Sequence, residues 1–141
     1  MAAQFTLGWL HEFGIGCNAD RQEAFHWYHR AASQGHPLAQ YRLAELVFLL
    51  HGRARLSSAL HWWTESSCRG TPQAQHRLST LFEDGRLIVG SREASYFWNL
   101  NACRQRFDAA LRHRPLLERS LDVTQRARVM SAVCAWTGSR E

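Results

Sequence analysis

The chain has 141 residues, of which 45% are hydrophobic, and its formal net charge is +5. This length predicts a single domain, residues 1–141, that buries a core of its own. The longest apolar run covers residues 46–50 and is far shorter than the roughly 20 residues of a membrane span. No signal-type segment is visible near the N-terminus, so we expect a cytoplasmic protein.

All 17 basic residues are arginine, which is typical of GC-rich coding and favours a bacterial source. A second interpretation is selection for bidentate contacts and stacking on aromatic rings. Residues 1–103 carry a net charge of +1 and residues 104–141 carry +4. The basic segment is either a phosphate-contacting surface or a solvated outer face.

Two short phrases of sequence occur three times along the chain. The first begins at Ala3 and returns at Ala39 and Ala74, with steps of 36 and 35 residues. The second contains the paired aromatic residues 27–28, 62–63 and 97–98, with two steps of 35 residues. A period in this range predicts an array of stacked supersecondary units.

Each unit opens with a predicted helix that has one apolar stripe. Counted from the first alanine, positions 0, 4, 7 and 11 point the same way on a helix. They hold Ala3, Leu7, Leu10 and Gly14, then Ala39, Leu43, Leu46 and Leu50, then Ala74, Leu78, Leu81 and Gly85. Position 5 is small in every unit (Gly8, Ala44, Ser79), which lets another helix approach closely.

A second helix is predicted to begin near Asp20, Leu56 and Ser91. Its stripe has i, i+3, i+4, i+7 spacing. The stripe residues are Ala24, Trp27, Tyr28 and Ala31, then Ala59, Trp62, Trp63 and Ser66, then Ala94, Phe97, Trp98 and Asn101. A glycine followed by a proline two residues later, as at residues 35–37 and 70–72, indicates a helix end.

The pattern Ala-Gln-x-x-Leu-Gly, Gly14-Ile15-Gly16, Trp27-Tyr28-x-x-Ala31-Ala32-x-x-Gly35-His36-Pro37 resembles a Sel1-like repeat. The resemblance implies an all-α, right-handed αα-solenoid related to tetratricopeptide repeats. We place three repeats at about 3–38, 39–73 and 74–106. The second departs from the pattern at residues 50–53. The third departs at residues 85–89 and has Arg104-Gln105 where a closing glycine is expected.

Residues of about 107–137 are interpreted as a C-terminal cap. Pro115 is expected to break any helix that passes through Leu111. A further helix is predicted to start at Asp122 and to cover the exposed stripe of the third repeat. One face of that helix holds Val123, Ala127, Met130, Val133 and Cys134. At the other end, Phe5, Leu7 and Trp9 lie near an unstacked edge, which is open to a partner or to a second copy.

The face of the first helices opposite the stripe is the candidate partner-binding, concave surface. It comprises Phe5, Trp9, Glu12, Tyr41, Glu45, Phe48, His76, Thr80 and Glu83. Aromatic residues with charged neighbours are typical of binding hot spots. We hypothesise a groove for a protein segment with a basic or aliphatic anchor. The alternative is that Phe5, Tyr41 and Phe48 pack between neighbouring repeats. The acidic character of this face argues against a wrapped nucleic acid.

No catalytic residue, cofactor site or metal site is predicted. Residues 14–16 lack the third glycine and the preceding strand of a dinucleotide loop. His26, His29 and His61 have no converging cysteine or carboxylate and are interpreted as exposed helix residues. Cys68 and Cys103 are placed at one repeat position, too far apart for a disulfide, and are expected to be two buried thiols.

The resemblance implies a non-catalytic adaptor or scaffold that binds another protein. Such repeats also occur in immunity proteins, and the alternative function is therefore the neutralisation of a cognate secreted toxin. An adaptor binds segments and leaves activity intact, whereas an immunity protein binds one toxin tightly and abolishes its activity. An enzyme or a metal-binding protein is the alternative of a different class, and the residues give it no support.

Overall fold

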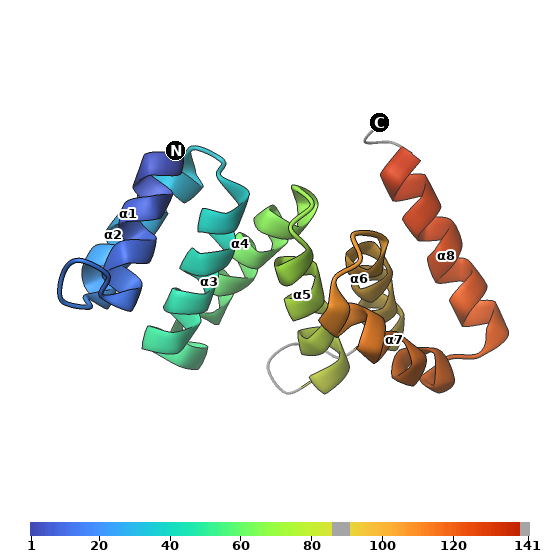
Figure 1. Ribbon diagram of the computed structural model, residues 1–141. Helices are drawn as coiled ribbons and strands as arrows, with labels where there is room; N and C mark the ends of the chain where they lie inside the picture. The colour runs from blue at the N-terminus through green and yellow to red at the C-terminus, as the bar shows by residue number, and fades with distance from the viewer. Residues whose placement is uncertain (86–90, 139–141) are drawn as a thin grey trace. The chain divides into compact units, whose positions relative to one another are not determined.

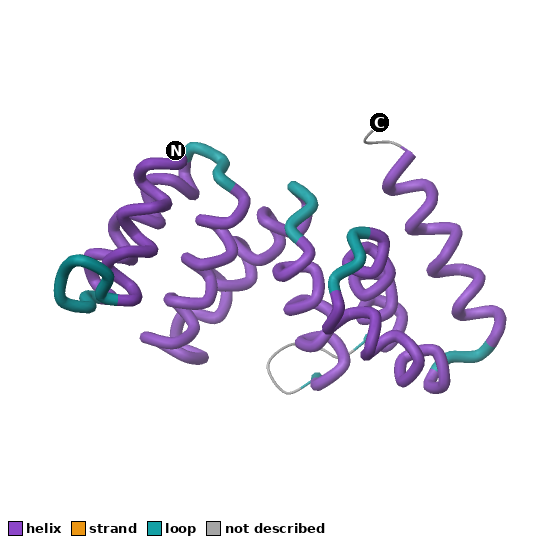
Figure 2. The backbone as a smooth tube through the Cα atoms, viewed as in Figure 1, coloured by secondary structure: helices purple, strands orange, loops and turns teal. Residues whose placement is uncertain are grey.

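The computed structural model describes residues 1–85 and 91–138 (Figures 1 and 2). These residues form eight α-helices and one short 3-10 helix, and no strand occurs among them. The all-α prediction is therefore confirmed. Contacts divide the chain into two compact units, residues 1–71 and 72–141, which are described separately below as the first and second unit.

The first unit contains α1 (Ala2–Phe13), α2 (Arg21–Ser33), α3 (Pro37–His51), η1 (Gly52–Arg55) and α4 (Leu56–Cys68). Each α-helix of the unit packs against the next one in the chain. Within this unit, Figure 1 shows α1 and α3 side by side, with α2 and α4 behind them. This is the predicted order of a first and a second helix in each of two repeats.

The core of the first unit follows the predicted stripes. Ala39, Leu43 and Leu46 of α3 are buried, as are the second-helix aromatics Tyr28 and Trp63. The small residues at position 5 are buried as well, because they face the second helix of their own repeat: Gly8 lies against the Tyr28 ring. On α1 the equivalent stripe residue Leu7 remains 36% exposed.

The turn between α2 and α3 is built as the sequence predicts. Asp20 caps α2 by accepting hydrogen bonds from the backbone N–H groups of residues 22 and 23. At the other end of α2, Gly35 has φ 91, a left-handed conformation that favours glycine. Pro37 then begins α3, and His36 Nδ1 accepts a hydrogen bond from the N–H of Ala39 at 3.1 Å.

The second unit contains α5 (Pro72–Asp84), α6 (Arg92–Arg104), α7 (Asp108–Ser120) and α8 (Val123–Gly138). Helix α6 is the centre of this unit, because α5, α7 and α8 all pack against it. Tyr96 and Leu100 of α6, Leu117 of α7, Leu121, and Val129 and Val133 of α8 form its main apolar cluster. The predicted loop at residues 85–89 lies largely outside the described residues.

The predicted register of α6 is wrong by one residue. The turn after α6 repeats the hydrogen bonds of the turn after α2, but Arg106 takes the place of Gly35 and has φ 57. Counting back from Arg106, the buried face is Ser95, Asn99 and Ala102. Ala94, Phe97 and Trp98, which were placed on that face, are only partly buried. Arg106, and not residues 104–105, therefore stands where the closing glycine was expected.

The same shift corrects the prediction for the cysteines. Cys103 is equivalent to Ser67 rather than to Cys68, because their carbonyls accept hydrogen bonds from the N–H groups of Arg106 and Gly70, the matching residues of the two closing turns. Cys103 is buried, whereas Cys68 is exposed. The two thiols therefore do not form the buried pair that the sequence count predicts.

The number of residues between equivalent helix positions is constant from one repeat to the next but varies within a repeat. From a position on the second helix of one repeat to the equivalent position on the first helix of the next repeat, the separation is always 20 residues. The pairs are Ala24 to Ala44, Ala59 to Ser79 and Ser95 to Pro115. Within a repeat, the separation between equivalent positions on the first and second helices is 16, 15 and 16 residues. The pairs are Gly8 to Ala24, Ala44 to Ala59 and Ser79 to Ser95. The loop inside a repeat varies, and the turn between repeats does not.

Pro115 does not break the helix, and this prediction is also wrong. Helix α7 runs through it from Asp108 to Ser120. The proline removes one backbone donor, and burial of Leu117 and Leu121 beyond it against Tyr96 keeps the chain helical. Ala110 is buried like Ala39 and Ala74, so α7 packs on α6 as the first helix of a further repeat would.

Helix α8 begins where the sequence predicts but buries a different face. The Asp122 carboxylate accepts the N–H of Gln125, and the Gln125 side chain accepts the N–H of Asp122, which is a reciprocal cap. Val133 is buried as expected, together with Val129. Val123, Ala127, Met130 and Cys134, however, are exposed. The cause is that α8 contacts α6 along the Val129–Val133 line.

Candidate interaction surface

The nine predicted surface residues lie on α1 and α3 of the first unit and on α5 of the second. In the first unit, Phe5 is packed rather than presented. Its ring stacks on His36, with centroids 4.8 Å apart, and lies 5.7 Å from the Tyr28 ring. Phe5 therefore joins α1 to α2 and to the turn before α3, as the packing alternative proposed.

Glu12 is held by two partners from two other helices. Tyr28 of α2 donates its hydroxyl hydrogen bond to Glu12 Oε2 at 2.6 Å. Arg42 of α3 donates from Nε to the same oxygen at 3.2 Å and forms an ion pair with Oε1 through Nη2. The carboxylate is therefore neutralised by its neighbours and is not a bare acidic group.

The pKa values of Tyr28 and Arg42 are both raised in this network. Burial, followed by the hydrogen bond and charge of Glu12, raises the pKa of Tyr28 well above its usual value, so the phenol stays neutral. Burial alone would lower the pKa of Arg42, but Glu12 and Tyr28 raise it overall. Tyr28, Glu12 and Arg42 thus form a fixed tripod beneath the surface of the first unit.

An exposed aromatic pair lies on this tripod. Trp9 is 42% exposed and Phe13 is 52% exposed, and their ring centroids are 5.4 Å apart. The Arg42 guanidinium lies over the Phe13 ring, 5.3 Å from its centroid. We call Trp9, Phe13 and Arg42 the aromatic face. Sequence reasoning missed Phe13, although its i+4 spacing from Trp9 places it on the same side of α1.

The three predicted residues on α3 differ in what they do. Glu45 accepts a hydrogen bond from Trp63 Nε1 at 3.1 Å, and the Phe48 ring lies 5.8 Å from the Trp63 ring, so both tie α3 to α4. Tyr41 is half-buried. The large exposed apolar residues of α3 are instead Leu38 and Leu49, at 41% and 60% exposure, which the sequence did not single out.

The predicted residues of the second unit are engaged inside that unit. His76 packs against the rings of Phe107 and His113, at centroid distances of 5.6 and 6.1 Å. Glu83 Oε2 lies 2.6 Å from His113 Nε2, a contact that is an ion pair only when the imidazole is protonated. Thr80 donates to the carbonyl of Arg77 in its own helix at 2.8 Å. Burial, then the charges of His113 and Arg77, lowers the pKa of His76.

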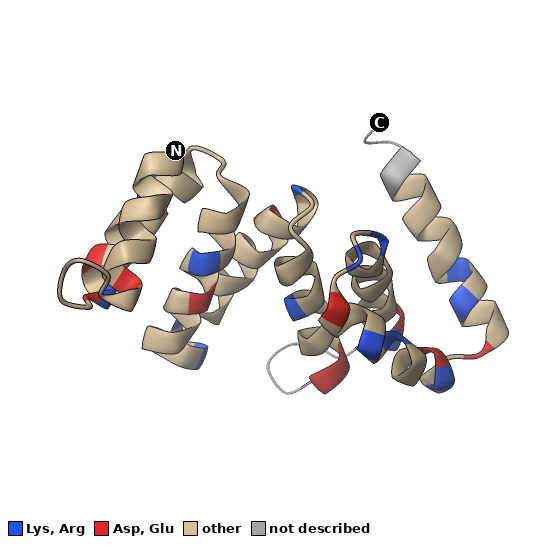
Figure 3. Cartoon of the chain, in the orientation of Figure 1, with Lys and Arg blue, Asp and Glu red and all other residues tan. Residues whose placement is uncertain are grey.

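The described residues contain no cluster of three or more histidine, cysteine, aspartate or glutamate side chains that could hold a metal ion. His26, His29 and His61 are exposed, as predicted. In the part of the chain that the structure covers, no helix is both long and apolar enough to cross a bilayer. Figure 3 shows charges of both signs on the helices of each unit, without one continuous basic strip on the drawn face of either.

Two solved structures share the fold. A Sel1 repeat protein from Oxalobacter formigenes superposes with a TM-score of 0.75 at 23% identity, over 82% of this chain and 48% of that one. The protein c5321, a protective antigen of uropathogenic Escherichia coli with an SLR fold, superposes with a TM-score of 0.72 at 19% identity, over 96% of this chain and 37% of that one. At these identities the likeness concerns the fold alone.

One curated relative matches a short stretch of the sequence. Chitin synthase regulatory factor 3 of Schizosaccharomyces pombe (strain 972 / ATCC 24843) is 51% identical over 43 residues. The match spans 30% of this chain and only 5% of that protein. The match therefore concerns a short segment of both proteins and carries no conclusion about the function of the whole chain.

The Sel1 repeat model matches residues 2–36, 37–71 and 72–106, within two residues of the repeats predicted from the sequence. Sel1 repeats generally serve as non-catalytic scaffolds that mediate protein–protein interaction. With three consecutive matches that cover most of its length, the chain belongs to the Sel1 repeat family.

Proposed function

We propose that this protein is a non-catalytic adaptor whose first unit binds another protein through the aromatic face. The observation that carries the proposal is the exposure of Trp9 and Phe13 on a support that is already fixed. Exposed aromatic rings beside an arginine are the residues that most often dominate binding energy. Leu38 and Leu49 supply further exposed apolar surface on α3 of the same unit.

Preorganisation favours this face over other exposed residues of the unit. Arg42 is held by Glu12, which is held in turn by Tyr28, so the guanidinium over Phe13 loses little freedom on binding. Side chains that are already ordered cost less to immobilise than long free ones. The aromatic face therefore presents a rigid platform to a partner.

The same network favours one of the two anchors considered from the sequence. A basic anchor needs an accessible carboxylate, but Glu12 is occupied by Tyr28 and Arg42. An aliphatic anchor needs only the exposed rings and their apolar neighbours. We therefore propose a partner segment with an aliphatic side chain that packs on Trp9 and Phe13.

Affinity capture with matched variants tests the proposal. The wild-type chain, the double variant Trp9→Ala/Phe13→Ala and the control Leu116→Ala are immobilised in equal amounts and exposed to lysate of the native host. Leu116 is 59% exposed and lies in the second unit. A true partner is retained by the wild type and by the control and is lost from the double variant. If all three chains retained the same partners equally, the aromatic face would not be the binding surface.

The captured protein then distinguishes the adaptor from the immunity function. We expect the purified partner to bind with a Kd at least tenfold weaker to Trp9→Ala, a loss of about 1.4 kcal/mol. For an adaptor, the activity of the partner is unchanged in the complex. A secreted toxin whose activity is abolished at equimolar ratio would instead establish the immunity function.

A second copy of the chain is the competing occupant of this region. Leu7 and Trp9 expose apolar surface on α1 that a symmetric dimer would bury. Sedimentation equilibrium over a wide concentration range gives the test. If the wild type dimerises and Trp9→Ala remains monomeric, self-association takes the place of the partner segment.

A further inference from the structure

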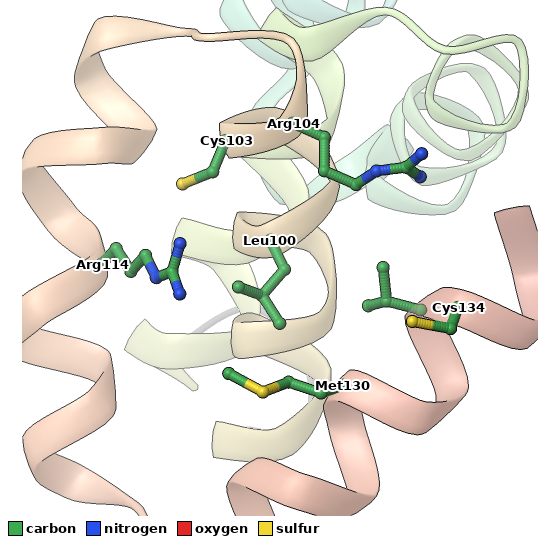
Figure 4. A pocket seen from close by; sticks show the side chains of 7 residues that line it. Leu100, Cys103, Arg104, Arg114, Met130 and Cys134 are labelled. Atoms are coloured by element: carbon green, nitrogen blue, oxygen red, sulfur yellow. The ribbon is translucent and has the colours of Figure 1, made fainter.

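A pocket lies in the second unit between α6, α7 and α8, far in sequence from the aromatic face. Its volume is about 330 Å³, which is at the lower end of the range of small-molecule sites, roughly 300–1,000 Å³. Figure 4 shows the side chains that line it, which come from the three helices. They are Leu100, Cys103, Arg104, Arg114, Met130, Val133 and Cys134.

Three of the side chains that line the pocket, those of Leu100, Met130 and Val133, are large and apolar. Leu100 and Val133 form the floor and are 7% and 6% exposed. Met130, at 41% exposure, lies at the rim. A ligand that covers apolar surface open to water is stabilised in proportion to the apolar area that it buries.

Two arginines from different helices add positive charge to this apolar site. In Figure 4 the guanidinium of Arg114 points from α7 toward Leu100, whereas that of Arg104 extends from α6 above Cys134 and away from Arg114. Arg114 Nε donates to Glu118 Oε1 at 2.7 Å, which leaves the other edge of the guanidinium toward the pocket. A fixed guanidinium with one free edge is suited to a carboxylate.

The support behind Arg114 resembles the tripod of the first unit. Tyr96 donates its hydroxyl to Glu118 Oε1 at 2.9 Å, so one carboxylate oxygen receives both the phenol and the guanidinium. The hydrogen bond from Arg114 and the nearby charge of Arg126 help to lower the pKa of Glu118. Burial and then Glu118 raise the pKa of Tyr96 to about 12. The single negative charge of Glu118 can neutralise only one of the two guanidinium groups, Arg114 and Arg126, that act on it.

We propose that this pocket binds a small amphiphile with a carboxylate head and a linear aliphatic tail, of the medium-chain fatty-acid class. The head pairs with Arg114, and the tail covers Leu100, Met130 and Val133. The pocket is too small for a helix of a partner protein, and its charge selects an anion over a cation or a neutral lipid. This inference concerns the second unit and does not depend on the proposed partner-binding face.

Alkylation of Cys134 in the full chain reports occupancy directly. Cys134 is exposed and lines the pocket, whereas Cys17 and Cys68 are exposed in the first unit and serve as internal controls. Rates of iodoacetamide labelling are followed by mass spectrometry with decanoate below its micelle concentration. We expect labelling of Cys134 to become about tenfold slower when decanoate is at about nine times its Kd. Labelling of the two control thiols stays unchanged.

Three ligands and three variants separate the contributions of head, tail and pocket. Decanol lacks the charge and acetate lacks the tail, so neither should protect Cys134 at the same concentration. Arg114→Gln should raise the Kd for decanoate about tenfold, the equivalent of about 1.4 kcal/mol. Arg112→Gln removes an exposed arginine of α7 outside the pocket and should change nothing. Met130→Trp fills the pocket from an exposed position and should abolish protection.

Three results would overturn the proposal. The first is unchanged Cys134 labelling at every decanoate concentration. The second is equal protection by decanol and decanoate, which would show that Arg114 does not bind the carboxylate head. The third is protection by an acidic peptide and not by decanoate, which would assign the pocket to a protein partner. Circular dichroism of each variant confirms that a loss of protection is not a loss of fold.

Discussion

Gly8 of α1 lies directly against the ring of Tyr28 in α2, so close that a methyl group on Gly8 would be 2.6 Å from Cδ1 and 2.7 Å from Cε1 of that ring. The ring has no room to yield, because Tyr28 is fully buried and its hydroxyl is held by Glu12 at 2.6 Å. The close approach of α1 and α2 therefore depends on the missing side chain.

Gly8→Ala is expected to destabilise the first unit. Overpacking a fixed core costs about 1–3 kcal/mol, which outweighs the gain of about 1 kcal/mol from replacing glycine in a helix. Urea unfolding measures the free energy of unfolding, and Thr6→Ala on the exposed side of α1 is the control, with a change of about 0.5 kcal/mol or less. An increase in stability would show that the ring can move aside.

Arg106→Gly is expected to stabilise the second unit by about 1 kcal/mol. The arginine has φ 57, and a side chain in this region carries a steric cost of roughly 1–2 kcal/mol that glycine avoids. The reverse change at an equivalent turn is the matched control: Gly70 has φ 92 and no atom within 4 Å of an added Cβ, so Gly70→Ala tests backbone strain alone. If both variants changed stability in the same direction, the strain explanation would be wrong.

Pro115→Ala is expected to stabilise the second unit by about 1–3 kcal/mol. Proline inside a helix removes a hydrogen bond and clashes with the preceding turn, at a cost of about 3 kcal/mol. Pro115 is exposed, so the substitution leaves no cavity. Thermal or urea unfolding gives the value, with Leu116→Ala as the neighbouring control. An unchanged free energy of unfolding would mean that α7 has already adapted to the proline.

Protonation of His76 is expected to weaken the second unit in mild acid. Burial first, then His113 and Arg77, holds its pKa below the ordinary 6.5, so the unfolded chain takes up the proton at a higher pH than the folded chain. The stability that this group contributes is present above about pH 6.5 and is lost as the pH falls through the lower folded pKa.

Urea unfolding at about pH 8 and about pH 5.5, on either side of the ordinary histidine pKa, checks this expectation. His76→Gln should reduce the loss of stability between the two conditions. His51→Gln, which removes an exposed histidine from the first unit, is the control for the loss of one histidine. An equal loss in wild type and His76→Gln would assign the pH dependence to other groups.

The sequence predicted the helices and their buried stripes well, because these depend on local spacing. Ala39, Leu43 and Leu46 repeat at 4 and 7 residues, and any helix with that spacing has one apolar side. The register of α6 could not be predicted by counting from α4, since the loop length inside a repeat changes. Only the turn at Arg106, seen through its hydrogen bonds and its positive φ, fixes which residues face inward.

The candidate site was harder to predict because its chemistry depends on distant partners. Glu12 was predicted to belong to the open face of α1, but its partners Tyr28 and Arg42 lie 16 and 30 residues away in sequence, and its side chain is only 13% exposed. Without them, Glu12 resembles an acidic group that awaits a basic ligand. The exposure of Phe13 likewise depends on how α1, α2 and α3 pack, which no single-helix pattern contains.

The constant spacing between repeats and the variable spacing within them have a practical consequence for engineering. Residues 14–20 and 52–55 lie within repeats, where the chain already accepts different lengths. A fluorophore, epitope or short insertion placed there should leave the stacking of helices undisturbed. One residue added at the turns near residues 34–36 or 105–107 would instead rotate the following helix by about 100° and point its apolar stripe away from its neighbour.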